Sequence, residues 1–305
     1  MPDFKVHILG CGSATPTARH RPSCQVVDAH GKLFMIDCGE GAQLEFRHQS
    51  LKFSRLNHIF ISHLHGDHFL GLPGLLSTMA LHQKEGDITV HIHPEGARLL
   101  QEIMAVLCRE TSYTLHYDII RPGERRVLYE DKSLVVETFP LFHRVPCSGF
   151  IFREKQPRRP LRADMLEFHN IPVAARGAIA AGEDYTTPDG RVIPNAWLTL
   201  DPPEPASYAY CSDTLASPEV AKSVAGVRTL YHEATYDDAQ EFKAAPRGHS
   251  TARQAAIVAR EAGARNLVIG HYSKSIADES VLTTQAAEEF AGPVTAAMEG
   301  LVFNP

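Results

Sequence analysis

One short apolar run followed directly by a cluster of ionisable side chains constrains this sequence most. Residues 59–71 read IFISHLHGDHFLG, so a strand-like segment leads into His63, His65, Asp67 and His68. A buried strand fixes the backbone that enters such a loop, and imidazole and carboxylate groups are ligands that zinc prefers. A purely structural role would leave several of these groups unpaired. The loop therefore predicts a metal site at the end of a strand.

The spacing inside this loop allows two metal ions. In His63-x-His65 the rings are one residue apart and can face the same ion, whereas the adjacent pair Asp67 and His68 can turn toward a second ion. Any one of these histidines could be a chance member of a chain with 17 histidines. Because a loop of four ligands cannot close two sites, we expect further ligands at the ends of later strands.

Three polar residues occupy such positions. His143 follows the strand-like run VVETFPLF, Asp213 follows YAYCS, and His271 follows NLVIG. Taken singly, each could be a cap or a surface residue, but their repeated placement at strand ends favours metal binding. Asp213 is the natural bridge, because one carboxylate can give an oxygen to each ion.

The rest of the chain alternates β-rich runs with helical patterns, which predicts a mixed α/β fold. One helix is expected to begin with Pro94 in its first turn, and another to begin at Ser250 or Thr251 as its cap and to end near Gly263. The strand-like runs are FKVHIL, CQVVDAHGKLFMID with a His-Gly turn, NHIFIS, DITVHIH, SLVVETF, SYAYCS, RTLYHEA and NLVIGH.

Composition limits the partners of the chain. It has 305 residues, of which 44% are hydrophobic, and a net charge of −6, so any site for a polyanion must be local. Six dispersed cysteines without a Cys-x-x-Cys pair are typical of core thiols in a reducing cytoplasm. The apolar run near the N-terminus is too short for a signal peptide or a membrane span, so we expect no membrane association.

Strand and helix patterns become sparse between about residues 152 and 207. Compact domains rarely carry so long a loop without a function, and the composition here suits an excursion from the body. The segment REKQPRRPLR opens this stretch with five basic residues against one acidic residue, an arrangement suited to phosphate contacts, although a solvated charge run is the alternative. The basic residues are Arg153, Lys155, Arg158, Arg159 and Arg162.

A loop rich in Thr and Pro, residues 13–23, is expected to line the active site, with Arg19 and Arg21 available for phosphate. Seven histidines have no motif around them and are interpreted as core or surface residues. They are His7, His30, His82, His91, His93, His116 and His169.

The ordered motifs resemble those of ribonuclease Z, a family of tRNA 3′-processing endonucleases in the metallo-β-lactamase superfamily. The histidine loop alone is shared by the whole superfamily, whereas HEATY followed by GHST is specific to this family. The resemblance spans almost the full length. Its motifs are LGCGSATPTARHRPSC, MIDCGEGAQLEFR, ISHLHGDHFLGLPGLL, PLFHRVPCSGF, YAYCSDT, LYHEATY, RGHSTARQAA and VIGHYS.

The resemblance implies a dinuclear zinc centre in an α/β fold, a four-layer αββα sandwich. One zinc would be bound by His63, His65 and His143, the other by Asp67, His68 and His271, with Asp213 between them. It further implies that Asp67 is the general base, and that Glu233 and His249 assist protonation of the leaving oxygen. From the residues alone, Glu233 would be interpreted as a salt-bridge residue and His249 as a helix cap.

The resemblance also implies the substrate and the assembly. Precursor tRNA would be cut to leave a 3′-hydroxyl on the tRNA and a 5′-phosphate on the trailer. Residues 1–305 would form one domain with an inserted flexible, tRNA-binding arm at 153–203, and the protein would be a cytoplasmic homodimer whose arm serves the partner's substrate. The sequence departs from the family at IPVAARG, where Ala174 and Ala175 stand in place of Gly-Pro.

Two other functions compete with this one. A hydrolase of a small phosphodiester or ester would share the histidine loop, but the basic excursion counts against it. A noncatalytic RNA-binding relative would not need seven intact ligand candidates, since an unused site is free to lose them.

Overall fold

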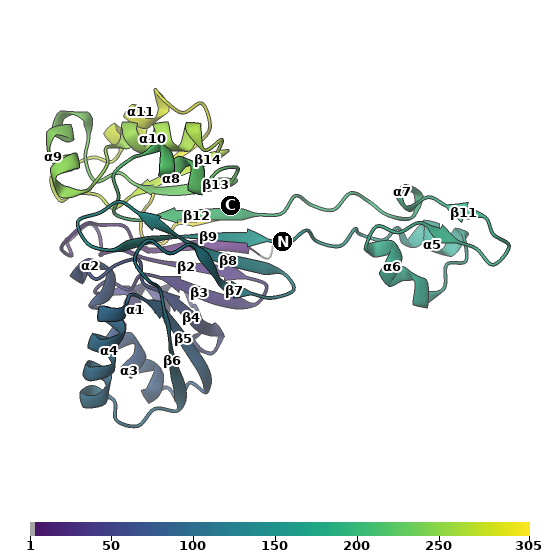
Figure 1. Cartoon of the computed structure of the whole chain (residues 1–305), viewed down its shortest axis with the longest axis horizontal. Coiled ribbons are helices and arrows are strands. Elements are labelled where there is room, and N and C mark those ends of the chain that lie inside the picture. The colour runs from purple at the N-terminus through teal and green to yellow at the C-terminus, as the bar shows by residue number, and fades with distance from the viewer. Residues whose placement is uncertain (1–3) are drawn as a thin grey trace.

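The computed structural model describes residues 4–305, which form two seven-stranded sheets packed face to face (Figure 1). The strand order in the first sheet is β16 (Val302–Phe303), β1 (Phe4–Gly10), β2 (Cys24–Ala29), β3 (Lys32–Ile36), β4 (Leu56–Phe60), β5 (Gly86–Ile92) and β6 (Tyr113–Ile119). In the second sheet it is β15 (Val294–Ala296), β14 (Asn266–Gly270), β13 (Thr229–Glu233), β12 (Ser207–Cys211), β9 (Cys147–Glu154), β8 (Leu134–Leu141) and β7 (Arg126–Glu130).

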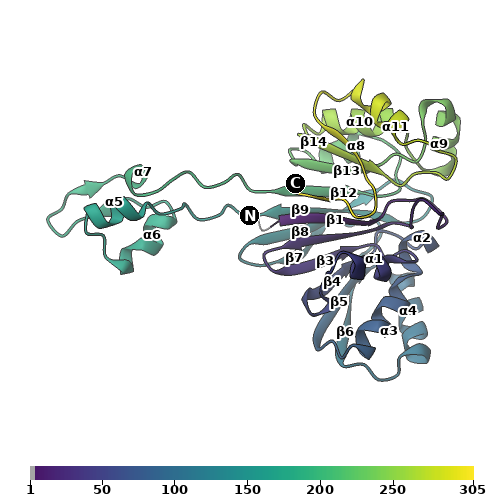
Figure 2. The same cartoon turned by 180° about the vertical axis from the view of Figure 1, so that it is seen from behind.

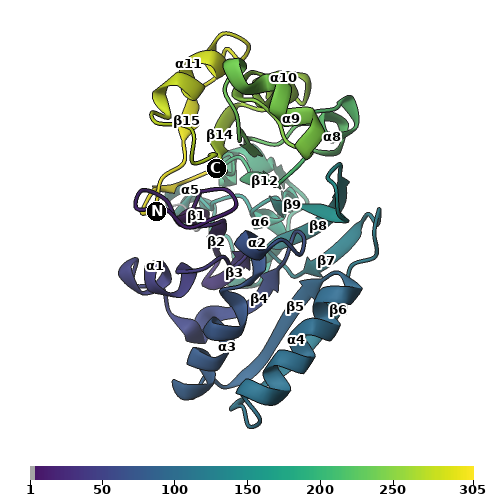
Figure 3. The same cartoon turned by 90° about the vertical axis from the view of Figure 1, so that its left-hand side faces the viewer.

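Helices cover the outer face of each sheet (Figures 1 and 3). The first sheet carries α1 (Ala42–His48), η1 (Phe53–Arg55), α2 (Gly66–Phe69), α3 (Leu72–Leu81) and α4 (Pro94–Leu107). The second sheet carries α8 (Pro218–Ser223), η3 (Asp238–Gln240), α9 (Glu241–Arg247), α10 (Ala252–Glu261) and α11 (Ser280–Ala287). The predicted four-layer αββα fold is therefore confirmed. Within residues 4–305, no helix is long and apolar enough to cross a membrane.

Aromatic side chains join the two sheets. The ring centroids of Phe34 in β3 and Phe152 in β9 lie 5.9 Å apart, and those of Phe60 in β4 and Phe150 in β9 lie 5.4 Å apart. All four side chains are fully buried, and burial of each stabilises the fold by about 1.5–3 kcal/mol. This core fixes β4 against β9, and so it fixes the loop that follows β4.

All eight strand-like runs form strands. His30 (φ 49°) and Gly31 (φ 80°) make the expected turn between β2 and β3. Pro94 occupies the first turn of α4, and of the two candidate caps Thr251 is the one that begins α10. Seven strands of residues 4–305 were not predicted. The strands β6 and β7 are half-exposed, and β10 (Tyr185–Thr186), β11 (Val192–Ile193), β15 and β16 have only two or three residues, whereas β9 is mostly buried and was missed without such a reason.

A long excursion leaves the second sheet between β9 and β12. These strands are antiparallel neighbours, with Arg153 opposite Ser207, and the chain between them projects far from both sheets (Figures 1 and 2). Because Arg153 and Glu154 belong to β9, the excursion begins after Glu154, not at Arg153 as the sequence predicted. We call residues 155–206 the arm.

The outer part of the arm has a small core of its own, formed by Leu166, Ile171, Ile179, Ile193 and Leu198. Its elements are α5 (Ala163–Phe168), η2 (Val173–Ala175), α6 (Arg176–Ala180), β10 (Tyr185–Thr186), β11 (Val192–Ile193) and α7 (Asn195–Leu198). Ala174 and Ala175, which replace the expected Gly-Pro, lie in the helical turn η2. At the base of this outer part, the amide of Leu200 donates to the carbonyl of Pro160 at 2.8 Å.

Candidate metal centre

All seven predicted ligands meet at one edge of the sandwich. The strands β4, β8, β12 and β14 end there, and the ligands lie in the loops that follow them and in α2. Because each strand is held by its neighbours and by the core between the sheets, the four loops begin from fixed positions. Strand-end placement therefore brings together side chains that are up to 208 residues apart in the sequence, from His63 to His271.

One group of ligand atoms comes from His63, His65, His143 and Asp213. His65 Nδ1 lies 3.0 Å from His63 Nε2 and 3.3 Å from His143 Nε2. Asp213 Oδ2 lies 3.5 Å from His63 Nε2 and 3.8 Å from His143 Nε2. Four ligands around a tetrahedral zinc would be about 3.3 Å apart, given zinc–ligand bonds of about 2.0–2.1 Å. The group therefore fits one zinc ion.

The second group consists of Asp67, His68 and His271, together with the other oxygen of Asp213. Asp213 Oδ1 lies 3.3 Å from His68 Nε2 and 3.1 Å from His271 Nε2, while Asp67 Oδ2 lies 3.5 Å and 3.4 Å from the same two atoms. Asp213 thus offers one oxygen to each group, as expected for a bridging carboxylate.

Hydrogen bonds from the other ring nitrogens orient three of the imidazoles. His143 Nδ1 donates to the carbonyl of Gly248 at 2.8 Å, and His271 Nδ1 lies 2.9 Å from Thr235 Oγ1. His63 Nδ1 lies 3.0 Å from Ser62 Oγ. These contacts leave each Nε2 free to bind a metal, which is the usual arrangement around protein-bound zinc.

Gly248 must be a glycine at this position. Its φ is 72°, and a Cβ atom there would lie 2.7 Å from His143 Nδ1. A side chain would strain the backbone and displace the imidazole that the Gly248 carbonyl holds.

Asp37 supports the centre from behind, and the sequence interpretation missed it. It is fully buried and accepts hydrogen bonds from the amide and hydroxyl of Ser62, from His68 Nδ1 and from the hydroxyl of Tyr210, at 2.7–2.8 Å. It follows the apolar strand β3, so its strand-end position is the same signal that identified Asp213 and His271. Asp37 (φ 55°) and His271 (φ 64°) both adopt left-handed backbone, which is strained for residues with a Cβ.

The protonation states suit metal binding. Burial lowers the pKa of His63 to about 4, and burial also lowers the pKa of His65 and His143, so these rings are neutral at pH 7. Although burial opposes it, the neighbouring imidazoles hold the pKa of Asp67 and of Asp213 below its usual range. Neutral imidazoles and ionised carboxylates are the forms that bind a metal.

His68 adds a second indication of a cation site. Burial acts to lower its pKa, but Asp213, Asp37 and Asp67 raise it well above the usual value. This ring therefore carries a positive charge among three carboxylates when no metal is present. A metal ion would replace that proton, and the residues present fit the dinuclear centre that the sequence predicted.

Glu233 and His249 form a buried pair beside Asp213. His249 Nδ1 lies 3.0 Å from Glu233 Oε1 and 3.9 Å from Asp213 Oδ2. Glu233 is 0% exposed and also accepts from the amides of Ser250 and Thr235 at 2.9 Å. Burial opposes ionisation of both members, yet their attraction lowers the pKa of Glu233 and raises that of His249. Glu233 thus contacts the His249 ring from a position that is closed to solvent.

The loop 13–23 reaches the edge of the sandwich where the ligands meet, which we call the metal edge, and it contacts the ligands through its backbone. The amide of Ala14 donates to Asp67 Oδ2 at 2.7 Å. Arg19, which we expected to be available for phosphate, instead donates to the carbonyl of Ala277 at 2.7 Å and pairs with Glu279, and Arg21 pairs with Glu45 at 3.2 Å. The structure thus places the loop at the site but engages both guanidinium groups elsewhere.

The five basic residues predicted to contact substrate lie along β9 and the arm, away from the metal ligands. Four of them form ion pairs: Arg153 with Glu137 (3.8 Å), Lys155 with Glu130 (2.6 Å), Arg159 with Asp201 (2.7 Å) and Arg162 with Asp164 (3.0 Å). Within residues 4–305, Arg158 forms no ion pair. The acidic partners reduce the positive field that the sequence alone indicated.

An αββα sandwich with this His- and Asp-rich centre at its edge defines a metal-dependent hydrolase of the metallo-β-lactamase class. Comparison with known proteins narrows this class. The chain is 47% identical over 296 residues to ribonuclease Z of Phocaeicola vulgatus, covering 97% of this chain and 96% of that protein. It is 49% identical over 298 residues to ribonuclease Z of Porphyromonas gingivalis, covering 97% of each. The chain belongs to the ribonuclease Z family.

Solved structures agree with this assignment. The short form of human tRNase Z superposes with a TM-score of 0.70 at 26% identity, covering 98% of each chain. YhfI of Bacillus subtilis, a metallo-β-lactamase-fold protein, gives a TM-score of 0.69 at 17% identity over 99% of each chain and shows the shared fold. The profile of the family described as "Anti-Pycsar protein Apyc1" matches residues 4–155, which contain five of the seven predicted ligands.

Proposed function

We propose that this chain is an endoribonuclease that removes the 3′ trailer from precursor tRNA. The observation that carries the proposal is identity of 47–49% to ribonuclease Z proteins over nearly the full chain, in a structure whose seven ligand candidates converge. The cut leaves a 3′-hydroxyl on the tRNA and a 5′-phosphate on the trailer.

The proposed cofactor is two Zn²⁺ ions per subunit. The nitrogen and oxygen ligands, their spacing and the two-sided position of Asp213 support this assignment. When bound, two such ions supply a water whose pKa falls from 15.7 to about 7 and stabilise charge on the phosphate oxygens.

Asp67 is the proposed general base. Its Oδ2 faces His68 and His271 and is held by the amide of Ala14 at 2.7 Å. Its lowered pKa keeps it ionised at neutral pH, so it can accept a proton from the attacking water.

His249 is the proposed acid for the leaving 3′-oxygen. Its Nδ1–H donates to Glu233, so Nε2 carries the proton that is transferred. Burial acts to lower the pKa of His249, but Glu233 acts in the other direction and the pKa lies above its usual value, which favours the protonated ring before the transfer. After the transfer, the neutral ring retains Nδ1–H and its bond to Glu233.

The arm is the proposed tRNA-binding element. It projects far from the metal edge (Figure 2), so it can contact a part of the substrate remote from the cleaved bond. Arg158, Arg176 and Arg191 form no ion pair within residues 4–305 and are available for phosphate, whereas Arg159 and Arg162 must exchange an acidic partner for it.

We further propose a homodimer in the cytoplasm. The resemblance to ribonuclease Z supports the dimer, and sedimentation of the purified protein tests it. The six cysteines are all free thiols, which suits a reducing compartment.

Mapping the cut in an end-labelled precursor tRNA tests the function. We expect one metal-dependent cut that separates the tRNA, with a 3′-hydroxyl end, from the trailer, with a 5′-phosphate end. If the zinc-loaded protein binds the precursor without cutting it, a noncatalytic role replaces the proposal. If it hydrolyses only small phosphodiesters or esters, the substrate assignment is wrong.

A further inference from the structure

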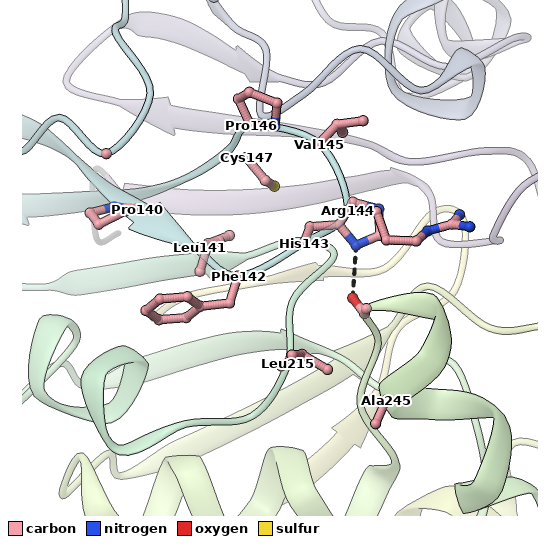
Figure 4. Close-up of a pocket in the computed structure, with 12 residues that line it drawn as sticks. Pro140, Leu141, Phe142, His143, Arg144, Val145, Pro146, Cys147, Leu215 and Ala245 are labelled. Atoms are coloured by element: carbon pink, nitrogen blue, oxygen red, sulfur yellow. Dashed lines mark hydrogen bonds between the residues drawn. The ribbon is translucent and has the colours of Figure 1, made fainter.

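A cavity of about 520 Å³ opens beside the first group of metal ligands (Figure 4). Its walls come from the loop between β8 and β9, from Leu215 after the bridging Asp213, and from Ala245 and Gly248 at the end of α9. His143, a proposed zinc ligand, also lines it. The cavity and the metal centre therefore share a wall.

Hydrogen bonds fix this wall relative to the centre. The amide of Phe142 donates to Thr214 Oγ1 at 3.0 Å, and the amide of Leu215 donates to the Phe142 carbonyl at 2.9 Å. On the other side, His143 Nδ1 donates to the Gly248 carbonyl at 2.8 Å (Figure 4). Phe142 is thus anchored to the segment that carries Asp213, and the cavity keeps a constant position relative to the reacting phosphate.

The lining suits a flat aromatic group. Phe142 is 41% exposed, although an aromatic ring without a partner gains nothing from contact with water. Leu215 and Ala245 add apolar surface. Arg144 also lines the cavity and extends from the same loop in the opposite direction from Phe142 (Figure 4), so its charge lies on the side away from the Phe142 ring and is available for a phosphate. Stacking of a nucleobase on an aromatic side chain is a common mode of single-strand recognition.

The direction of the reaction decides which base can occupy the cavity. The leaving 3′-oxygen belongs to the last nucleotide of the tRNA and must lie at His249. Gly248, the residue before His249, lines the cavity, and the rings of His143 and His249 are 5.1 Å apart. The last nucleotide of the tRNA, which carries the leaving 3′-oxygen, therefore lies next to the cavity. The first trailer nucleotide lies on the other side of the reacting phosphate.

We propose that this cavity binds the nucleobase of the last nucleotide of the tRNA, and that Phe142 stacks on it. This inference rests on the proposed function and assigns to it a subsite for the nucleotide that carries the leaving oxygen. The subsite positions the 3′-oxygen against His249 and shares His143 with the metal centre.

The test compares three precursor tRNAs in single-turnover cleavage: one unmodified, one with an abasic last tRNA nucleotide, and one with an abasic first trailer nucleotide. With the parent protein we expect the first abasic site to lower kcat/KM by about tenfold, as loss of one stacked base does. Phe142→Ala should lower kcat/KM for the unmodified precursor by a similar factor and should show no further loss with that abasic site. Phe142→Tyr keeps the ring and should behave as the parent.

Phe242→Ala is the matched control, because Phe242 is 73% exposed on the neighbouring helix α9 but does not line the cavity. With Phe242→Ala, the abasic last tRNA nucleotide should lower kcat/KM by the same factor as with the parent protein. The inference would be overturned if the losses of kcat/KM caused by Phe142→Ala and by the abasic tRNA nucleotide were additive. It would also be overturned if Phe142→Ala abolished the effect of the abasic trailer nucleotide instead. Failure of the parent to cut the unmodified precursor would instead overturn the proposed function.

Discussion

The metal edge and the arm are built on opposite principles. At the edge, each ligand follows a buried strand, and hydrogen bonds from Ser62, Asp37, Thr235 and Gly248 hold four of the imidazoles from behind. In the arm, five leucine and isoleucine side chains form a small core, and ion pairs such as Arg159–Asp201 and Arg162–Asp164 lie on the surface. Rigidity is thus concentrated where bonds are cleaved, and the arm adds reach without adding ligands.

The largest effect is expected from Asp67→Ala. This change removes a ligand of the second metal and the proposed base, so cleavage of precursor tRNA should fall by at least about 10⁴-fold, the upper end for loss of one acid-base group. Single-turnover cleavage and zinc content measure the effect. Asp164→Ala, the same change in the arm, should leave the chemical step and both ions intact. Substantial cleavage by Asp67→Ala would remove this residue from the chemistry.

His249→Ala should slow kcat by about 10²- to 10⁴-fold while both metal ions are retained, because His249 is the proposed proton donor and is not one of the seven proposed ligands. Glu233→Gln should act in the same direction, since it weakens the contact that orients His249. Zinc analysis together with kcat separates this role from that of a ligand. Loss of zinc equal to that of Asp67→Ala would contradict the division between the two residues.

Asp37→Asn tests the hydrogen bonds that support the metal ligands from behind. Removing this charge should weaken zinc binding by about 10- to 100-fold, as is typical for residues that hold a metal-binding imidazole. It should also destabilise the metal-free protein, by about 1–3 kcal/mol, because buried donors lose their acceptor. Zinc titration and denaturant unfolding measure the two effects. Unchanged zinc affinity would show that His68 needs no such support.

Removal of the arm should have a smaller effect, confined to substrate binding. Glu154 and Ala206 are hydrogen-bonded neighbours at 2.9 Å, so an Asn-Gly turn can replace residues 155–205. We expect KM for precursor tRNA to rise about tenfold or more. Arg158, Arg176 and Arg191 are removed with the arm and form no ion pair within residues 4–305, so the log–log salt slope should fall by about 0.9 for each of them that contacts a phosphate.

Hydrolysis of a small activated phosphodiester by this arm-deleted protein is the control. It should stay within about tenfold of the parent, an allowance of about 1.4 kcal/mol in the barrier. An unchanged KM and salt slope for precursor tRNA would exclude the arm from substrate binding.

The comparison also shows what the sequence could reveal. The ligands were predictable because each follows an apolar strand, and strand ends in one sheet meet at one edge. Asp37 has the same signal, but its function depends on His68 and Tyr210, which approach it only in the folded chain. The acidic partner of Arg159 was missed for a similar reason, since Asp201 lies 42 residues after it, whereas Asp164 lies only two residues after Arg162 and could have been found in the sequence. Local patterns identify candidates, and long-range pairing decides what they do.

The boundary of the arm was misplaced for a related reason. We predicted from the sequence that the arm begins at Arg153, because the run of basic residues begins there. Pairing with Ser207 of β12, more than 50 residues away, keeps Arg153 in β9, and pairing with Leu134 of β8 keeps Glu154 there.

Zinc titration of activity tests the central claim most directly, that a two-ion centre at the sheet edge performs the cleavage without the arm. Metal-free parent and arm-deleted proteins would be titrated with Zn²⁺ while bound zinc and hydrolysis of the small phosphodiester are followed. We predict that both proteins are inactive without metal and recover fully at two ions per chain, with the parent also recovering precursor tRNA cleavage at the same point. Activity in metal-free protein, full recovery at one ion, or failure of only the arm-deleted protein to recover would contradict it.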